Sequence, residues 1–258
     1  MVLNYYTPIK TFWEGLQSAQ ETGAFRIPLR DTLLNSPEVY GFSLLRKAIL
    51  AYETEQGIPE DKGKSQMPFY RQYQQRLIGP EVIPFIASFY EEGTEYKETN
   101  NPYITLTFDY NRLAEHCLSE NISLFRCKYD EIQNMKSLKK CLEREYDKIF
   151  FDDENTGFTP DSRFISLLYN ALLEIRPENE SQHKEWRLAL FKTPEEVDYL
   201  WEEQTIRTST TWDIPLSCLE RIELKPDYRE MPELYTALIG MMKHCGLVPE
   251  QILTGLVE

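Results

Sequence analysis

The sequence predicts one domain of the α+β class, in which a mixed, largely antiparallel central sheet is flanked by helices. Segments with an apolar residue at every second position alternate irregularly with segments whose apolar residues recur at helical spacing. Several predicted strands are joined by short turns, which favours antiparallel pairing over regular strand–helix–strand units. The length of 258 residues fits one large domain or two small ones. We predict a single domain over residues 1–258.

Composition and charge narrow the class of protein. Hydrophobic residues make up 41% of the chain and aromatic residues 13%, which suffices for a sizeable core and is not a disordered composition. The net charge is −14 and the pI is about 4.8. Because an acidic surface repels phosphate backbones, we predict no general nucleic-acid binding.

Targeting and metal signals are weak. The amino terminus has no basic stretch before an apolar block, and no apolar run approaches the roughly 18–20 residues of a membrane helix. We therefore predict a cytoplasmic protein without membrane association. The acidic residues 152–157 lack the spacing of a calcium loop, so no metal site is expected. Five dispersed cysteines argue against a disulfide framework or a zinc site: Cys117, Cys127, Cys141, Cys218 and Cys245.

In the first half of the chain, polar residues mark where helices begin. Thr7 before Pro8 and Ser36 before Pro37 predict helix starts, Gly23 closes the first helix, and Asp109 caps a later one. Helical spacing of apolar residues predicts helices over residues 9–22, 36–52, 69–77 and 109–118. Alternating apolar runs between them predict strands over residues 3–6, 24–28, 82–90, 103–108 and 122–129.

The second half of the chain shows the same two patterns. Helical spacing predicts helices over residues 130–151, 159–176, 194–203 and 231–245, with a short final element over residues 248–257. Alternation predicts strands over residues 185–190, 206–214 and 221–224.

The strand that begins at Glu185 carries the most informative charges. Trp186, Leu188 and Leu190 alternate with polar residues, so we predict that these three are buried while Glu185 and Arg187 share the opposite face. Two interpretations of that face remain open. It is either a solvated or salt-bridged sheet surface, or a carboxylate held by a cation at the mouth of a cleft.

Several short segments, in this order along the chain, carry a family resemblance: Tyr5-Tyr6-Thr7, Asn35-Ser36-Pro37, Ala87 to Glu92, Lys184-Glu185-Trp186-Arg187 and Ile214 to Leu224. Through their order and spacing, nearly the whole chain resembles the bacterial proteins grouped as domain of unknown function 2971. The family's early histidine strand, middle serine strand and late glutamate are in turn similar to the layout of ADP-ribosyltransferase-type domains.

The second likeness implies an NAD site. Tyr5 to Thr7 would border the nicotinamide end of the cofactor, and Ser88 would lie on the central strand. Glu185 would be the catalytic carboxylate that stabilises an oxocarbenium-like centre. Arg187 would either fix Glu185 or meet a phosphate. We therefore expect Tyr5 to Thr7, Ser88 and Glu185 to converge at one cleft.

The chain also departs from the family pattern. Tyr5 stands in place of the histidine, Ser36 stands in place of an aspartate, and a Trp-x-x-Tyr-Gly segment is absent. These departures weaken the case for catalysis. A second hypothesis is therefore a non-catalytic domain that binds a nucleotide-like small molecule or a protein segment. A third interpretation assigns Tyr5, Tyr6 and Ser88 no role beyond packing within a sheet.

Overall fold

The structure is a computed structural model of the chain. It describes residues 1–31, 36–60, 62–65, 83–94, 103–149, 152–153, 157–158, 167, 169, 171, 173–202, 205–225 and 232–249. The predicted helix over residues 69–77 lies outside the described residues, as do most of the predicted helix over residues 159–176 and most of the element over residues 248–257.

The fold is α+β, as the sequence predicts. The strands are β1 (Val2–Pro8), β2 (Ala24–Asp31), β3 (Ile83–Glu91), β4 (Tyr103–Asp109), β5 (Ser123–Arg126), β6 (Asp152–Asp153), β7 (Gly157–Phe158), β8 (Glu185–Lys192), β9 (Asp198–Glu202), β10 (Thr205–Pro215) and β11 (Leu219–Lys225). The helices are α1 (Ile9–Thr22), α2 (Ser36–Glu55), α4 (Tyr110–Ser119), α5 (Glu131–Ile149) and α7 (Pro232–His244), with short 3-10 turns η2 (Glu178–His183), η3 (Pro194–Glu196) and η4 (Leu216–Cys218).

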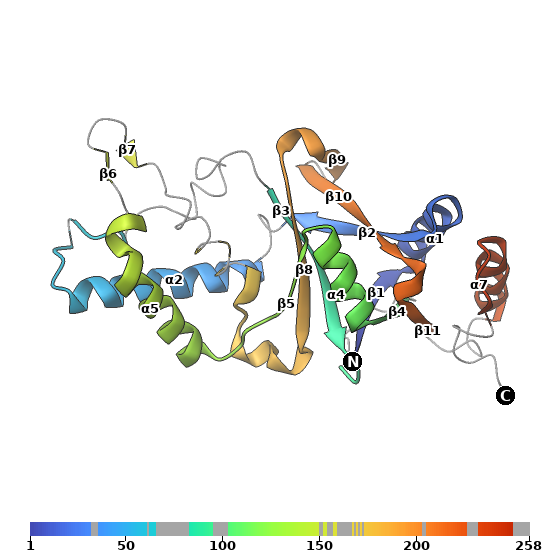
Figure 1. Cartoon of the computed structure of the whole chain (residues 1–258), viewed down its shortest axis with the longest axis horizontal. Coiled ribbons are helices and arrows are strands. Elements are labelled where there is room, and N and C mark those ends of the chain that lie inside the picture. The colour runs from blue at the N-terminus through green and yellow to red at the C-terminus, as the bar shows by residue number, and fades with distance from the viewer. Residues whose placement is uncertain are drawn as a thin grey trace.

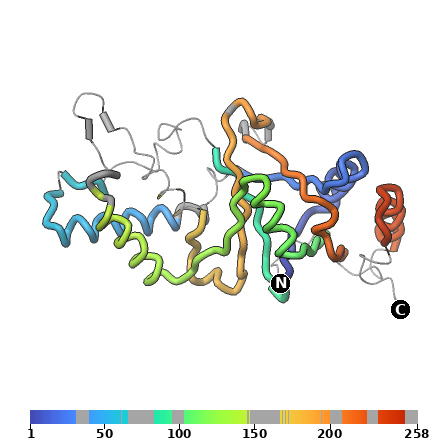
Figure 2. Tube along the Cα trace, viewed as in Figure 1, coloured from blue at the N-terminus to red at the C-terminus, as the bar shows by residue number. Residues whose placement is uncertain are grey.

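One curled sheet organises the molecule. Within the described residues it has nine strands, and β3 is its branch point. One edge of β3 pairs with β8 along its length, and β8 also pairs with β5. The pairings between these named strands are antiparallel. Figure 2 shows β3 and β8 running side by side through the middle of the trace, although they are far apart in the sequence.

The other edge of β3 is divided between two arms of the sheet. The first arm, β1-β4-β11, meets β3 where Leu3 and Asn4 pair with residues 91 and 90. The second arm, β2-β10-β9, meets β3 where Arg30 and Asp31 pair with residues 86 and 85. Between these two contacts, the described strands pair with residues 87–89 on the β8 side only. The sheet is therefore split beside the middle of β3.

Helix α1 bridges the two arms, because it follows β1 directly and leads into β2. It packs closely on β2: a Cβ atom at Gly15 would lie 2.5 Å from the carbonyl oxygen of Arg26, so no larger residue fits without a shift. Gly23 ends the helix with φ of 73°, a left-handed conformation that glycine adopts readily. The short crossover keeps β1 and β2 on the same side of β3.

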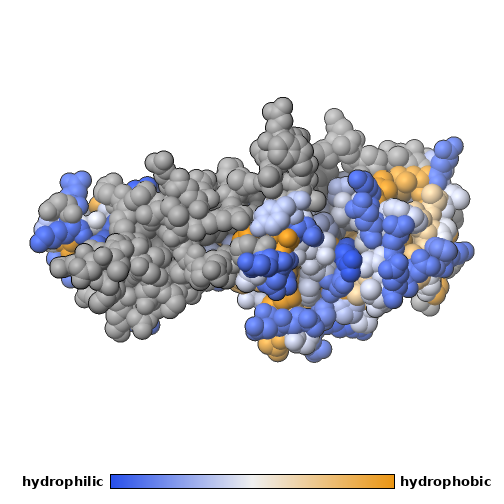
Figure 3. Space-filling view, turned by 90° about the horizontal axis from the view of Figure 1, so that it is seen from above, coloured by the Kyte–Doolittle hydropathy of each residue, from blue (hydrophilic) through white to orange (hydrophobic). Residues whose placement is uncertain are grey.

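Helices occupy both ends of the elongated molecule (Figure 1). Helices α2 and α5 pack against each other at one end, where the rings of Tyr52 and Tyr146 lie 4.9 Å apart. Helix α7 lies at the other end, and the thiol of Cys245, the residue that follows α7, donates a hydrogen bond to the carbonyl oxygen of Leu16 in α1. The face in Figure 3 is mainly hydrophilic where its side chains are described, with smaller apolar areas.

Two local predictions are wrong. The acidic helix predicted over residues 194–203 is replaced, in the described residues 194–202, by the turn η3 and strand β9, because β9 pairs with β10 from Glu202 to Asp198. Thr7 does not cap α1. It is buried in β1 opposite Ile104, and α1 begins at Ile9 without a side-chain cap. The predicted cap at Asp109 is confirmed, since its carboxylate accepts a hydrogen bond from the backbone N–H of Arg112 at 2.8 Å.

The five cysteines carry free thiols. Among the described residues, no cluster of three or more histidine, cysteine, aspartate or glutamate side chains is arranged to hold a metal ion. In the same part of the chain, no helix combines the length and apolar character that a bilayer crossing requires.

Candidate functional site

The predicted burial of Trp186, Leu188 and Leu190 is confirmed only for Leu188, and the opposite face, which carries Glu185 and Arg187, is buried rather than solvated. The strand itself and its alternation are as predicted, and Leu188 is fully buried. However, Glu185 is 3% exposed and Arg187 is 0% exposed, whereas Trp186 and Leu190 are only half-buried. Arg187 is the largest of the fully buried side chains in the described core. The charged face of β8 is therefore an interior surface.

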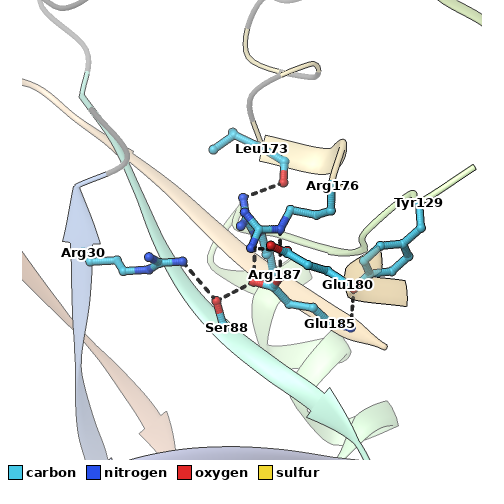
Figure 4. Close-up of polar contacts among 8 residues, drawn as sticks. All are labelled: Arg30, Ser88, Tyr129, Leu173, Arg176, Glu180, Glu185 and Arg187. Atoms are coloured by element: carbon cyan, nitrogen blue, oxygen red, sulfur yellow. Dashed lines mark hydrogen bonds and ion pairs between the residues drawn. The ribbon is translucent and has the colours of Figure 1, made fainter. Parts of the chain in front are cut away.

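The carboxylate of Glu185 lies at the centre of a polar network (Figure 4). Its Oε1 atom accepts hydrogen bonds from the Ser88 hydroxyl at 2.6 Å and from Nε of Arg187 at 2.9 Å. Its Oε2 atom lies 3.2 Å from Nε of Arg176. Both carboxylate oxygens are thus engaged by neighbouring side chains, and two guanidinium groups balance the buried negative charge.

The surrounding backbone holds this network in place. The backbone N–H of Glu185 donates to the hydroxyl of Tyr129 at 2.8 Å. Nη1 of Arg187 donates to the carbonyl oxygen of Leu173 at 2.9 Å, which ties β8 to the segment just before η2. The backbone N–H of Arg176 donates to the carbonyl oxygen of Lys128 at 3.0 Å. Three segments distant in sequence therefore fix the position of one carboxylate.

Burial and the neighbouring charges act in opposite directions on the pKa of Glu185. Burial raises it, but Arg187, Arg176 and the hydrogen bond from Ser88 together outweigh burial, so the pKa lies below its ordinary value. The carboxylate is consequently ionised at neutral pH. Burial, with a smaller contribution from Glu185, raises the pKa of Tyr90 to about 12, so this phenol stays neutral.

A cleft of about 570 Å³ lies at the split in the sheet. This volume is within the range of roughly 300–1,000 Å³ that small-molecule sites occupy. Strands β1, β2 and β3 and the segment around η2 form its walls. The lining residues are Tyr5, Tyr6, Pro28, Leu29, Arg30, Ile86, Ala87, Ser88, Tyr90, Arg176, Glu180 and His183.

The residues predicted for the site are brought together to different degrees. Tyr5, Tyr6 and Ser88 line the cleft. Glu185 lies behind the wall and reaches the cleft through its hydrogen bond with Ser88. Arg187 lies deeper still and binds Glu185, which is one of the two alternatives that the resemblance implies.

Thr7 is the predicted site residue that stands apart. It is 1% exposed and is not among the residues that line the cleft. Its hydroxyl donates a long hydrogen bond of 3.4 Å to the carbonyl oxygen of Pro8.

The sequence did not predict five of the cleft-lining residues as site residues: Arg30, Tyr90, Arg176, Glu180 and His183. Arg30 carried a usable signal, because it lies on the polar side of the alternating strand β2, with Nη2 3.5 Å from the Ser88 hydroxyl. Arg176 and Glu180 carried none, since their place at the cleft depends on how residues 173–183 pass over β8.

Comparison with known proteins gives no match to a protein-family model, to a curated protein or to a solved structure.

Proposed function

We propose that the cleft at the sheet split binds a nucleotide-like small molecule, with NAD as the first candidate, and that the domain acts mainly by binding. The observation that carries the proposal is the position of Ser88. This residue lines a cleft together with Tyr5 and Tyr6, and its hydroxyl also bonds the buried Glu185. Three of the segments that carry the family resemblance, those around Tyr5, Ser88 and Glu185, thus lie together.

The chemistry of the walls supports an anionic ligand with an aromatic ring. Arg30 and Arg176 line the cleft, and Arg187 lies behind its wall. The carboxylates in the same region are those of Glu180 and Glu185. Three cations against two anions make this region locally positive in a chain whose net charge is −14. The half-buried rings of Tyr5 and Tyr6 offer apolar surface for a ring.

Binding without efficient turnover fits the state of Glu185. A carboxylate that stabilises an oxocarbenium-like centre must face the reacting atom. Here both oxygens of Glu185 are held by Ser88, Arg187 and Arg176, and the side chain is almost fully buried. A second candidate function, ADP-ribosyl transfer from NAD, is favoured by the direct Ser88–Glu185 bond, which places the carboxylate one residue behind the cleft wall.

Thermal unfolding with NAD tests the binding proposal. A ligand at about 100 times its Kd stabilises the folded state by about 2.7 kcal/mol, which corresponds to roughly 5–10 °C in Tm for a chain of this size. Arg30→Gln should reduce the shift. Arg26→Gln is the matched control: Arg26 lies four residues earlier on the same exposed side of β2, but it pairs with Asp213 and does not line the cleft.

Two outcomes decide between the candidates. If NAD leaves the melting curve unmoved up to millimolar concentration, NAD binding is wrong. If NAD binds and free nicotinamide accumulates in proportion to wild-type protein, transferase or hydrolase activity replaces the binding-only function.

A further inference from the structure

Arg176 connects the cleft with the buried network. Its side chain is 8% exposed and lines the cleft. It meets two carboxylates through different nitrogens: Nε lies 3.2 Å from Oε2 of Glu185, and Nη2 lies 2.8 Å from Oε2 of Glu180. Arg176 therefore contacts two of the protein's own carboxylates, with which an incoming anion would have to compete; the side chains are drawn in Figure 4.

The two carboxylates differ in how firmly they are held. The side chain of Glu185 is 4% exposed and is also bound by Ser88 and Arg187. The side chain of Glu180 is 24% exposed and belongs to the 3-10 turn η2, in which no residue is buried. Displacing Glu185 would leave a buried charge, whereas Glu180 can turn toward water at small cost.

We propose that Glu180 is an internal anionic ligand of the cleft, and that an external anionic ligand binds Arg176 by displacing it. This inference rests on the proposed function of the cleft. The ligand class is a small molecule with a phosphate or diphosphate group, since a guanidinium forms paired hydrogen bonds with phosphate as it does with carboxylate. While Glu180 occupies Arg176, the external ligand cannot bind there. The apparent affinity for that ligand is therefore its intrinsic affinity multiplied by the fraction of molecules in which Glu180 has left Arg176.

The same contact links ligand binding to the position of η2. Glu180 and His183 both line the cleft from this turn. When Glu180 leaves Arg176, the ion pair that ties η2 to the cleft wall is lost. Ligand binding would then loosen the turn, and the imidazole of His183 would be able to move with it.

Isothermal titration with NAD and with inorganic pyrophosphate tests the inference. Glu180→Gln removes the competing charge and should bind both ligands about three- to tenfold more tightly than the wild type. Glu178→Gln is the matched control. It makes the same charge change on the same turn, but Glu178 is exposed and is not a lining residue. Its affinities should equal those of the wild type.

Two further measurements separate competition from a general change in the cleft. Neutral nicotinamide should bind wild type and Glu180→Gln equally, because it does not compete for a cation. In the background of Arg176→Gln, Glu180→Gln should give no gain. If Arg176→Gln unfolds, the more conservative Arg176→Lys should still shrink the gain, since lysine lacks the planar fork of the guanidinium.

The outcomes distinguish this inference from the proposed function. If the wild type binds NAD and Glu180→Gln binds it with unchanged affinity, the internal-ligand role is wrong while the binding cleft stands. If neither protein binds NAD or pyrophosphate, both proposals are wrong. If Glu178→Gln gained as much affinity as Glu180→Gln, the change in net charge alone would explain the effect. The role of Glu180 would then also be wrong.

Discussion

Glu53 in helix α2 and Glu185 in strand β8 are each 3% exposed, but different groups compensate their charges. The carboxylate of Glu53 accepts hydrogen bonds from the backbone N–H groups of Lys64 and Ser65 and from the hydroxyl of Tyr146, the last at 2.5 Å. The carboxylate of Glu185 is bound by a serine hydroxyl and two guanidinium groups.

The surroundings of Glu53 indicate a structural role. It holds the chain where residues 62–65 turn back toward α2, and a Cβ atom at Gly63 would lie 2.8 Å from its Oε2 atom. Tyr146 comes from α5, so the same carboxylate also links the two packed helices. Residues that contact Glu53 are not among those that line the cleft.

The comparison shows that burial of a carboxylate does not by itself mark a functional site. Glu53 fastens a loop through neutral donors, and nothing about that arrangement needs a ligand. Glu185 binds Ser88 and Arg176, and both of these residues line the cleft. The guanidinium group that balances its charge therefore lies where a ligand would bind. The residues around a buried charge therefore carry the functional information.

Among the variants that test this difference between Glu53 and Glu185, Glu185→Gln is expected to lose the most stability. Removing the carboxylate takes a shared counter-charge from the buried Arg187 and Arg176, and breaking a buried ion pair in this way typically costs about 3–5 kcal/mol of stability. Urea unfolding measures the loss, with Glu178→Gln as an exposed control. Loss of stability is therefore the first effect expected of this variant. A loss below about 1 kcal/mol would contradict the role of this ion-pair network.

A smaller loss is expected for Glu53→Gln. The substitution keeps one acceptor oxygen but weakens charge-assisted hydrogen bonds to buried donors, at a cost of about 1–3 kcal/mol. Because Glu53 lies between α2 and α5, the affinity of the folded variant for NAD should equal that of the wild type. An NAD affinity reduced severalfold, measured where the variant is fully folded, would show that the two carboxylates are coupled after all.

The pH dependence of stability gives the smallest and most gradual effect. The pKa of Glu185 is lowered in the folded state from an ordinary value of 4.5. Its contribution is therefore fully present above about pH 4.5 and is lost as the pH falls from there through the lower folded pKa, by up to about 1.4 kcal/mol per pH unit. The stability difference between wild type and Glu185→Gln should narrow over that range. A difference that stays constant from pH 6 to below pH 4 would disprove this linkage.

Local sequence determined several of the elements. The alternation from Glu185 to Leu190 predicted β8 with Glu185 and Arg187 on one face, and both side chains are found on one face, joined by an ion pair. Asp109 predicted the start of α4 because capping depends on a side chain and a backbone N–H three residues apart. The composition and the mixture of periodicities predicted the α+β class. Each of these properties depends on neighbours in the chain, so the sequence displays it directly.

Tertiary structure decided which faces are buried and which charges meet. Strand β8 acquired an interior charged face because β3 and β5 pair with its two edges and residues 173–176 cross over it. Residues 198–202 became strand β9 because β10 offers a pairing edge, which outweighs a weak helical pattern. Arg30 and Arg176 reached one cleft because β1 and β2 separate beside β3. Apart from the β9–β10 pairing, which joins strands adjacent in the chain, these outcomes depend on contacts between residues 14 to more than a hundred positions apart, which local periodicity does not encode.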